Sequence, residues 1–298
     1  MVLLAGLGWR QRKIEYKSVS FLVFGKTGQV ATELSYLDGV TSLGRDQVTL
    51  TDPRACEAVI SDSAASAVIN AAAYTAVDRA EEERDTAMIV NAMAPAAMAS
   101  ACAAKKIPFV HISTDYVFDG FGDAPWKPDD ITGPLGVYGA SKLSGERGVA
   151  TAGGVYAILR TSWVFSAYGN NFLKTMLRLS QTHDHLTIVA DQIGGPTPAP
   201  AIAQACVTIA KTLISEPDKG GIYHFSGEPD TSWAGFAREI FKAAGRDITV
   251  EDIPTSAYPT PAERPLNSRL DCSSLTSQFG ITRPDWRQAV QDIVKVLT

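Results

Sequence analysis

Cysteine is scarce in this sequence, and the few cysteines follow no metal-binding or redox spacing. The four of them, Cys56, Cys102, Cys206 and Cys272, are scattered through 298 residues without a Cys-x-x-Cys pair. In a chain of this length, such a distribution predicts buried thiols and not a disulfide framework or a zinc site. We therefore expect a protein of a reducing compartment, the cytoplasm.

Positive charge is also in short supply. Lys and Arg number 27 against 32 Asp and Glu, which gives a formal net charge of −5 and argues against nucleic acid as a partner. The closely spaced His183 and His185 have no identifiable third ligand, so we expect a solvated turn there instead of a metal site.

Long hydrophobic runs are nearly absent. Residues 87–104 carry no charge over a span long enough for a membrane helix. Alanine dominates this run and Asn91 and Pro95 interrupt it, so a buried helix packed on a sheet is favoured and no membrane partner is expected. The opening "MVLLAGLGWRQRK" is a poor signal peptide, because its positive charges follow the apolar stretch instead of preceding it.

From residue 21 the sequence alternates short apolar runs with longer helical patterns. The runs "FLVF", "VTSL", "AVINAAA" and "PFVHIST" are separated by helical patterns from about residue 28, near 53–60 and near 80–104. This alternation predicts an α/β fold with a Rossmann-like, doubly wound parallel sheet. Beyond it, Pro- and Gly-rich segments predict a smaller C-terminal substrate-binding lobe. We expect an N-terminal extension at 1–20, a Rossmann domain at 21–165, and at 166–298 mainly the lobe, with some segments returning to the Rossmann domain.

The first predicted strand ends in a glycine-containing turn, "FLVFGKTGQVATEL". Gly25 and Gly28 would let backbone N–H groups approach a pyrophosphate at the start of the helix, and Ala31 would take the third small position. The spacing is Gly-x-x-Gly-x-x-Ala and not Gly-x-Gly-x-x-Gly, so a purely structural turn is an equal alternative for the motif alone. The surrounding alternation favours an NAD(P) site, whose candidate residues here are Gly25, Thr27, Gly28, Gln29 and Val30.

The end of the second strand discriminates between the two nicotinamide cofactors. A carboxylate there would bind the ribose of NAD, but the sequence reads "SLGRDQ". Gly44 leaves room, and the guanidinium of Arg45 suits the 2′-phosphate of NADP. NADPH is therefore favoured over NADH. Two alternatives stay open: Asp46 could neutralise Arg45 or bind the ribose itself, and Arg45 could be a solvent-exposed loop residue.

The stretch "VYGASKLSGE" places Tyr138 and Lys142 four residues apart, hence side by side on one face of a helix. Such a pair is expected about once by chance in a chain of this composition. Upstream, the strand "FVHIST" carries residues 113–116 at its carboxyl end, which is where open parallel sheets bind ligands. We expect Thr114, Tyr138 and Lys142 to meet there over a nicotinamide.

The chemistry of this pair depends on the proton of the phenol. A positive charge about 4 Å from Tyr138 would contribute roughly 4 kcal/mol at an effective dielectric of 20, equivalent to about three pKa units. Desolvation would oppose part of that shift. We therefore predict that Lys142 lowers the pKa of Tyr138 toward the working pH, making it a proton donor to a carbonyl oxygen held by Thr114.

Eight segments occur in one order: "GKTGQV", "NAAAYTAVDRAE", "STDYVFDG", "YGASKLSGE", "RTSWVF", "GNNF", "DQIGGPT" and "PTPAERPLNSRLD". Through them the chain resembles, over about residues 21–290, the extended sugar-nucleotide branch of the short-chain dehydrogenase/reductase superfamily, and within it the dTDP-4-dehydrorhamnose reductase family. The resemblance implies reduction of the 4-keto group of dTDP-4-dehydro-L-rhamnose to dTDP-L-rhamnose. A nicotinamide cofactor would supply the hydride, and a dTDP-sugar would be the substrate. For the assembly, the hypothesis is a homodimer.

By position, the resemblance makes Tyr138 the proton donor, Lys142 its tuner and ribose anchor, and Thr114 the third catalytic residue. It adds Ala71, Ala72 and Ala73 along the cofactor and Asp115, Tyr116, Trp163, Arg264 and Asn267 at the substrate. The alanines could equally be a tight strand end, and the proline-rich segment around Arg264 a plain linker. Related cofactor domains often carry Asp where this chain has Thr49, which leaves the adenine contact open.

Two other functions are compatible with the same segments. One is a non-catalytic regulatory subunit of a methionine adenosyltransferase, because a relative of this family has that role; the intact Thr114, Tyr138 and Lys142 favour an enzyme. The other is a sugar-nucleotide epimerase or dehydratase, which returns its hydride and keeps NAD bound; Arg45 favours a consumed NADPH.

Overall fold

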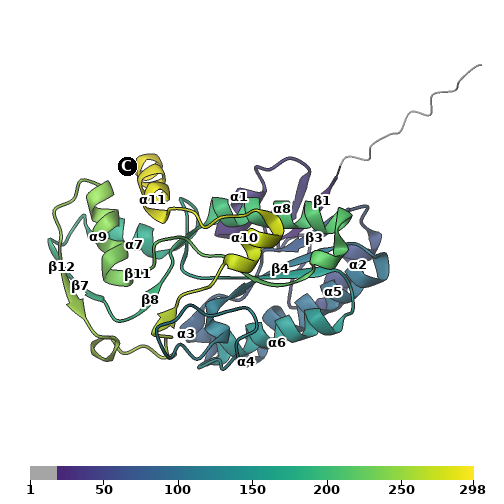
Figure 1. Ribbon diagram of the computed structural model, residues 1–298, viewed down its shortest axis with the longest axis horizontal. Helices are drawn as coiled ribbons and strands as arrows, with labels where there is room; N and C mark the ends of the chain where they lie inside the picture. The colour runs from purple at the N-terminus through teal and green to yellow at the C-terminus, as the bar shows by residue number, and fades with distance from the viewer. Residues whose placement is uncertain (1–18) are drawn as a thin grey trace, which may run out of the picture.

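A six-stranded parallel sheet forms the larger part of the molecule (Figure 1). The computed structural model describes residues 19–298; residues 1–18, most of the expected N-terminal extension, lie outside the described residues. The strands lie in the order β10-β5-β4-β3-β1-β2. Their bounds are β1 Phe21–Phe24, β2 Val40–Leu43, β3 Ala67–Asn70, β4 Phe109–Thr114, β5 Tyr156–Thr161 and β10 Gly221–His224. The predicted Rossmann-like α/β fold is confirmed.

Helices cover both faces of this sheet because its central strands are apolar on both sides. Along β1, Phe21 and Val23 join one buried cluster while Leu22 and Phe24 join another, as the two-residue period of a strand requires. The first cluster is completed by α1 (Gln29–Leu34), α8 (Ala199–Ser215) and α10 (Ser273–Phe279), and the second by α2 (Pro53–Asp62), α5 (Ala94–Lys105) and α6 (Val137–Thr151). Figure 1 shows the two groups of helices on opposite sides of the sheet.

The alanine-rich run belongs to a helical stretch that packs beside the sheet. After α3 (Val77–Ala80), the chain forms α4 (Arg84–Met88), a π-helical turn at Ile89–Met93 and α5. Arg84–Lys105 is the one helix of residues 19–298 that is long and apolar enough to cross a membrane, and half of its apolar window is buried in the protein. A Cβ at Gly145 of α6 would collide with the carbonyl oxygen of Asn91. Small residues thus bring α6 close to the π-helical turn.

A second lobe lies beside the sheet domain along the long axis of the molecule (Figure 1). Its hydrophobic cluster is built by α7 (Phe172–Leu179), α9 (Trp233–Ala243), α11 (Trp286–Leu297) and the parallel pair β7 (His185–Val189) and β12 (Thr249–Ile253). Three short strands form a further sheet, β8 (Ile193–Gly194), β11 (Thr231–Ser232) and β13 (Asn267–Ser268). The remaining pair is β6 (Val164–Phe165) with β9 (Thr197–Pro198). In the sequence, α8, β10 and α10 fall between segments of this lobe, but they belong to the main sheet domain. There β10 is a strand of the sheet, and α8 and α10 pack on one of its faces.

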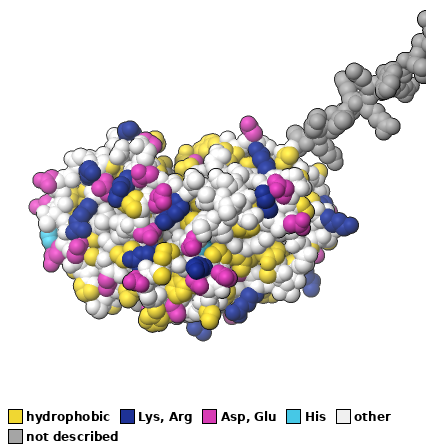
Figure 2. Space-filling view, viewed as in Figure 1, with side chains coloured by type: hydrophobic (Ala, Val, Ile, Leu, Met, Phe, Trp, Pro, Cys, Tyr) yellow, Lys and Arg dark blue, Asp and Glu magenta, His cyan; other side chains and the backbone are white. Residues whose placement is uncertain are grey.

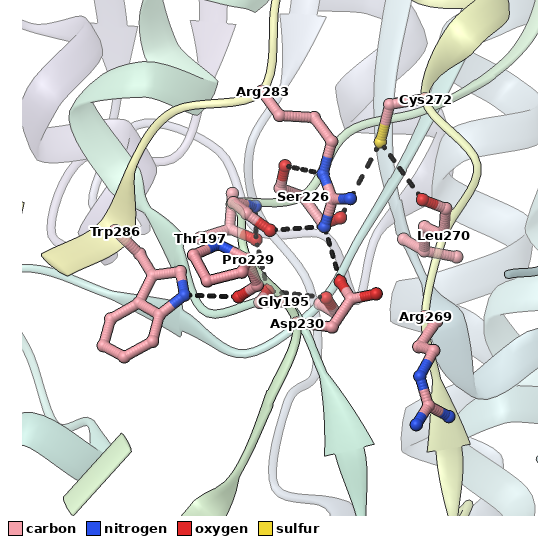
Figure 3. Close-up of polar contacts among 12 residues, drawn as sticks. Gly195, Thr197, Ser226, Pro229, Asp230, Arg269, Leu270, Cys272, Arg283 and Trp286 are labelled. Atoms are coloured by element: carbon pink, nitrogen blue, oxygen red, sulfur yellow. Dashed lines mark hydrogen bonds and ion pairs between the residues drawn. The ribbon is translucent and has the colours of Figure 1, made fainter. Parts of the chain in front are cut away.

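A network around Arg283 ties the start of the last helix to the loop between β10 and β11 (Figure 3). The guanidinium of Arg283 donates to the carboxylate of Asp230 at 2.6 Å and to the carbonyl oxygen of Gly227 at 2.6 Å. The indole N–H of Trp286, at the start of α11, donates to the carbonyl oxygen of Pro229 at 2.6 Å. The C-terminal helix is therefore anchored at its first residue.

The distribution of charged side chains on the surface and the burial of the cysteines agree with what the composition predicts. Figure 2 shows basic and acidic side chains intermixed over the face it presents. All four cysteines are buried and free, which confirms the prediction of buried thiols in place of a disulfide framework.

Candidate active site

The turn after β1 has the geometry that close approach to a ligand requires. Gly25 has a φ of +116°, which favours glycine. A Cβ there would lie 3.1 Å from the Cβ of Ala31 and 3.4 Å from the backbone of Ala71, so the small residues pack as expected. Gly28 is the N-cap of α1, and nothing lies within 4 Å of a Cβ built on it. Thr27 is exposed and Val30 is buried. The turn therefore leaves the backbone at Gly28 open to a ligand.

Gln29 differs from its neighbours in that its side chain points to the second lobe. Its Nε2 donates to the carbonyl oxygen of Val164 at 3.2 Å, and its Oε1 accepts from Ser166 at 3.2 Å and Asn171 at 3.0 Å. Asn171 also caps α7 by accepting from the N–H of Lys174. Only the backbone of Gln29 is thus free for a cofactor, while its side chain joins α1 to β6 and α7.

The loop after β2 places a guanidinium in solvent. Arg45 is exposed. The carboxylate of Asp46 folds over the α-carbon of Gly44, where a Cβ would collide with it, and the side chain of Lys26 reaches within 3.2 Å of the same point. A larger residue at position 44 would displace the side chain of Asp46, and Lys26 is a second cation beside the loop that the sequence analysis missed.

Thr114, Tyr138 and Lys142 come from two neighbouring elements. Thr114 is the last residue of β4, and Tyr138 and Lys142 lie in the first two turns of α6. A Cβ at Gly139 would collide with the carbonyl oxygen of Tyr116, so glycine lets α6 approach the end of β4. The rings of Tyr116 and Tyr138 meet edge to face with centroids 5.5 Å apart. Thr114 and Lys142 are buried and Tyr138 is half-buried.

The electrostatics of the pair correct the sequence prediction. Burial raises the pKa of Tyr138 to about 12, and the nearby Thr114 hydroxyl lowers it only in part. The Nζ of Lys142 donates to the carbonyl oxygen of Ile112 at 2.7 Å and lies 3.2 Å from the Nε2 of His111. Burial lowers the pKa of Lys142 itself to about 8. The pKa of Tyr138 is thus raised and not lowered toward the working pH, so the predicted direction of the shift is wrong.

Asp115 brings a buried carboxyl group to the same point. Its side chain is 2% exposed, its Oδ1 accepts from the Thr114 hydroxyl at 3.1 Å, and its Oδ2 has no partner among the described residues. Burial raises the pKa of Asp115 to about 6, against the opposing effect of the Ser268 hydroxyl. An unpartnered buried oxygen beside Thr114 is a group available to a ligand.

Trp163 follows β5 in a strained conformation. Its φ of +49° is unusual for a bulky residue. The indole stacks on that of Trp233, with centroids 3.7 Å apart and an interplanar angle of 13°. Trp233 in turn donates from its indole N–H to Gln192 at 3.0 Å. Sequence reasoning found Trp163 but missed Trp233.

The other two substrate candidates have partners within the protein. Arg264 forms an ion pair with Asp78 at 2.8 Å and is largely covered. Asn267 is buried; its Nδ2 donates to the carbonyl oxygen of Ala124 at 2.8 Å, and its Oδ1 accepts from Arg269. Asn267 therefore fixes the start of β13, and Arg264 ties the segment before β13 to α3.

Two buried polar residues that sequence reasoning missed stand behind the site. His111 lies in the middle of β4 and Asn70 ends β3, and both are at most 1% exposed. Asn70 accepts from the backbone N–H of Ala72, the middle residue of the half-buried alanine turn, at 3.1 Å. The signal in the sequence was a histidine inside an otherwise apolar strand, "FVHIST". Among residues 19–298 no group of three or more His, Cys, Asp or Glu side chains could hold a metal ion.

The fold and the site together define a class of protein. A doubly wound parallel sheet with a glycine turn after β1, and a Thr, a Tyr and a Lys at the carboxyl end of β4 and the start of α6, are the features of an extended short-chain dehydrogenase/reductase.

Comparison with known proteins specifies the family. The family model described as the RmlD substrate binding domain matches residues 19–298. The dTDP-4-dehydrorhamnose reductase of Sinorhizobium fredii is 45% identical, covering 92% of this chain and 96% of that protein. That of Escherichia coli K12 is 38% identical, covering 94% and 98%. The chain belongs to the dTDP-4-dehydrorhamnose reductase family, which confirms the resemblance.

Solved structures lead to the same family. A dTDP-4-dehydrorhamnose reductase from Clostridium acetobutylicum superimposes with a TM-score of 0.87 and 34% identity, covering 94% of this chain and 99% of that one. The enzyme of that name from Bacillus anthracis, in complex with NADP, gives a TM-score of 0.86 and 32% identity at the same coverage.

Proposed function

We propose that this protein reduces the 4-keto group of dTDP-4-dehydro-L-rhamnose to dTDP-L-rhamnose with NADPH. The observation that carries the proposal is the placement of Thr114, Tyr138 and Lys142 at the edge of the sheet onto which the glycine turn also opens, in a chain of this family. The names of its relatives supply the substrate, and the NADP complex of one of them supports the cofactor.

The residues of this chain fit a dinucleotide. Gly25 and Gly28 supply the cradle for the pyrophosphate, the turn at residues 71–73 would lie along the cofactor, and Arg45 would contact the 2′-phosphate of the adenosine. NADPH would supply the hydride for the carbonyl carbon. The protein must then hold the ketone and deliver one proton to its oxygen.

Tyr138 is suited to be that proton donor. With a pKa of about 12, the phenol keeps its proton at neutral pH, which is the state that a reduction needs. The Thr114 hydroxyl now donates to Asp115 at 3.1 Å and would turn to the ketone oxygen when substrate binds. Lys142 is covered by protein and lies one helical turn from Tyr138, where a positive charge would stabilise the phenolate that forms as the proton leaves.

The sugar nucleotide would occupy the space between the end of β4 and the second lobe. Asp115 offers an oxygen that has no partner among residues 19–298, and Tyr116 and Trp163 offer ring faces and edges for the sugar. Arg264 and Asn267 would act on the nucleotide side mainly by shaping their loop. The proposal includes the cytoplasm as the site of action and a homodimer as the assembly.

The decisive experiment is an NADPH oxidation assay with dTDP-4-dehydro-L-rhamnose, followed by identification of the product. We expect oxidation that requires the nucleotide-linked keto sugar and yields the 4-hydroxy product. Equal rates with simple ketones would refute the substrate assignment. Net epimerisation with NAD retained by the purified protein would identify an epimerase, and no turnover together with a stably bound second polypeptide would identify a regulatory subunit.

A further inference from the structure

Lys142 is connected to a chain of buried hydrogen bonds that leads away from Tyr138. Its Nζ lies 3.2 Å from the Nε2 of His111, and the Nδ1 of His111 lies 3.1 Å from the Nδ2 of Asn70. Asn70, His111 and Lys142 are each at most 2% exposed. In such a place every donor needs an acceptor, because an unmatched buried polar group is costly.

The direction of these hydrogen bonds is fixed at the end that lies farthest from Lys142, at Ala72. The backbone N–H of Ala72 can only donate, and it donates to the Oδ1 of Asn70 at 3.1 Å. The other end of the amide, Nδ2, is a donor and faces His111. The Nδ1 of His111 must therefore accept, and a neutral imidazole then carries its single proton on Nε2. That N–H points at the Nζ of Lys142.

An N–H pointing at Nζ requires an acceptor there. An ammonium has three donors and no lone pair, whereas a neutral amine has one lone pair and can still donate to the carbonyl oxygen of Ile112, 2.7 Å away. With an ammonium, the imidazole would have to carry its proton on Nδ1. The Asn70 amide would then have to turn, and the N–H of Ala72 would lose its acceptor. Only the neutral amine satisfies all four groups.

We propose that Asn70 and His111 are positioning residues for Lys142, and that at mildly alkaline pH they hold it as a neutral amine in the cofactor-free protein by presenting the Nε2–H of His111 to its Nζ. A neutral Lys142 leaves Tyr138 protonated before substrate arrives, so this inference rests on the proposed function and deepens it. The other charged group that acts on Lys142 is Glu146 on the same helix, which is ion-paired with the buried Arg160 of β5 at 2.7 Å. On the side of Tyr138 stands Asp115.

A second buried histidine, His224, serves as an internal reference for a test of this proposal. The Nδ1 of His224, also buried, lies 2.9 Å from the carbonyl oxygen of Trp126, which can only accept, and its Nε2 lies 3.4 Å from the guanidinium of Arg160, which can only donate. His224 must therefore carry its proton on Nδ1. The two buried histidines should be opposite tautomers, and the remaining two of the four, His183 and His185, are exposed.

The experiment is ¹⁵N NMR of the histidine side chains in cofactor-free protein at mildly alkaline pH. Protonated and unprotonated ring nitrogens give well-separated resonances. We expect a proton on Nε2 of His111 and on Nδ1 of His224 in one spectrum. A proton on Nδ1 of His111, as in His224, would overturn the proposal. This result needs no variant, and it does not depend on turnover.

The substitution Asn70→Asp tests the direction in which these hydrogen bonds are donated. Aspartate keeps the acceptor for Ala72 but cannot donate to His111, so the His111 proton should move to Nδ1 and Lys142 should become an ammonium. In NADPH oxidation, the pH dependence that belongs to Lys142 should shift upward by about one unit or more. Asn171→Asp, the same change at the N-cap of α7, should leave the His111 signals in place. An Asn70→Asp spectrum with the proton still on Nε2 would refute the argument.

The two hypotheses fail separately. If the protein proves not to be a reductase, the predicted tautomers of the cofactor-free protein are still tested by the NMR spectrum. If a predicted tautomer is wrong, the NADPH oxidation expected of the wild-type protein is unaffected.

Discussion

Asp115 is held in a state that should destabilise the protein at neutral pH. The carboxyl group has an ordinary pKa of 3.8 and a folded-state pKa of about 6, chiefly because of burial. Between these two values the folded state binds more protons than the unfolded state, so the free energy of unfolding falls as pH rises through this window. A difference of about two units corresponds to about 3 kcal/mol at 1.36 kcal/mol per unit, fully developed above the folded-state pKa.

Asp115→Asn removes the charge with little change in shape. At about pH 8 we expect the variant to be more stable than the wild type by about 1 to 3 kcal/mol, because the amide is still an incompletely bonded buried group. Near pH 4 the wild-type carboxyl group is protonated in the folded state, and the difference should largely vanish. Turnover should fall, since Asp115 is proposed to contact the sugar and active sites commonly trade stability for function.

Urea unfolding followed by tryptophan fluorescence at both pH values measures the effect. Asp62→Asn, at the exposed end of α2, is the matched control, and we expect it to change stability by no more than about 0.5 kcal/mol at either pH. A less stable Asp115→Asn variant at pH 8, or a difference that does not depend on pH, would show that burial of the charge is not what limits stability here.

Three further substitutions test the site. Tyr138→Phe should lower kcat by about 10²- to 10⁴-fold with NADPH binding, measured by fluorescence titration, nearly unchanged; substantial residual turnover would mean that another group or water protonates the oxygen. Arg45→Ala should reduce a wild-type preference for NADPH over NADH of roughly 10- to 100-fold in kcat/KM, and a loss of both activities alike would show that Arg45 only supports its loop. Gln29→Ala removes three hydrogen bonds to the second lobe and should lower the free energy of unfolding by roughly 1 to 3 kcal/mol; an unchanged Tm would show that the lobe is held by packing alone.

Local patterns were enough to predict β1 to β4 of the main sheet and to bring Thr114, Tyr138 and Lys142 together as candidate catalytic residues. The runs "FLVF" and "FVHIST" lack polar alternation because both faces of β1 and β4 are covered, so burial on two sides is visible in the sequence itself. Tyr138 and Lys142 are neighbours by helical spacing, and the end of β4 brings Thr114 to them because ligand sites form at the carboxyl ends of parallel strands.

The directions of side chains were not visible in those patterns. Helical spacing correctly put Lys142 beside Tyr138 on α6, but it could not show that the side chain of Lys142 turns toward Ile112 and His111 of β4. The predicted effect on the pKa of Tyr138 used a charge at a chosen distance, and the contacts of Lys142 and the burial of the phenol made that prediction wrong. Gln29 was likewise assigned to the cofactor by its place in the turn, although its amide serves the second lobe.

The sequence by itself therefore determined the first four strands of the sheet, the helical patterns between them and the candidate residues Thr114, Tyr138 and Lys142, because strand and helix periodicities act over a few residues at a time. Only the tertiary structure decided how those groups are charged and what holds them. Asn70 and His111 lie 41 residues apart, and Trp163 meets Trp233 across a still longer separation. Such contacts depend on how strands and lobes pack, and burial, which sets the pKa of each group, exists only once they have packed.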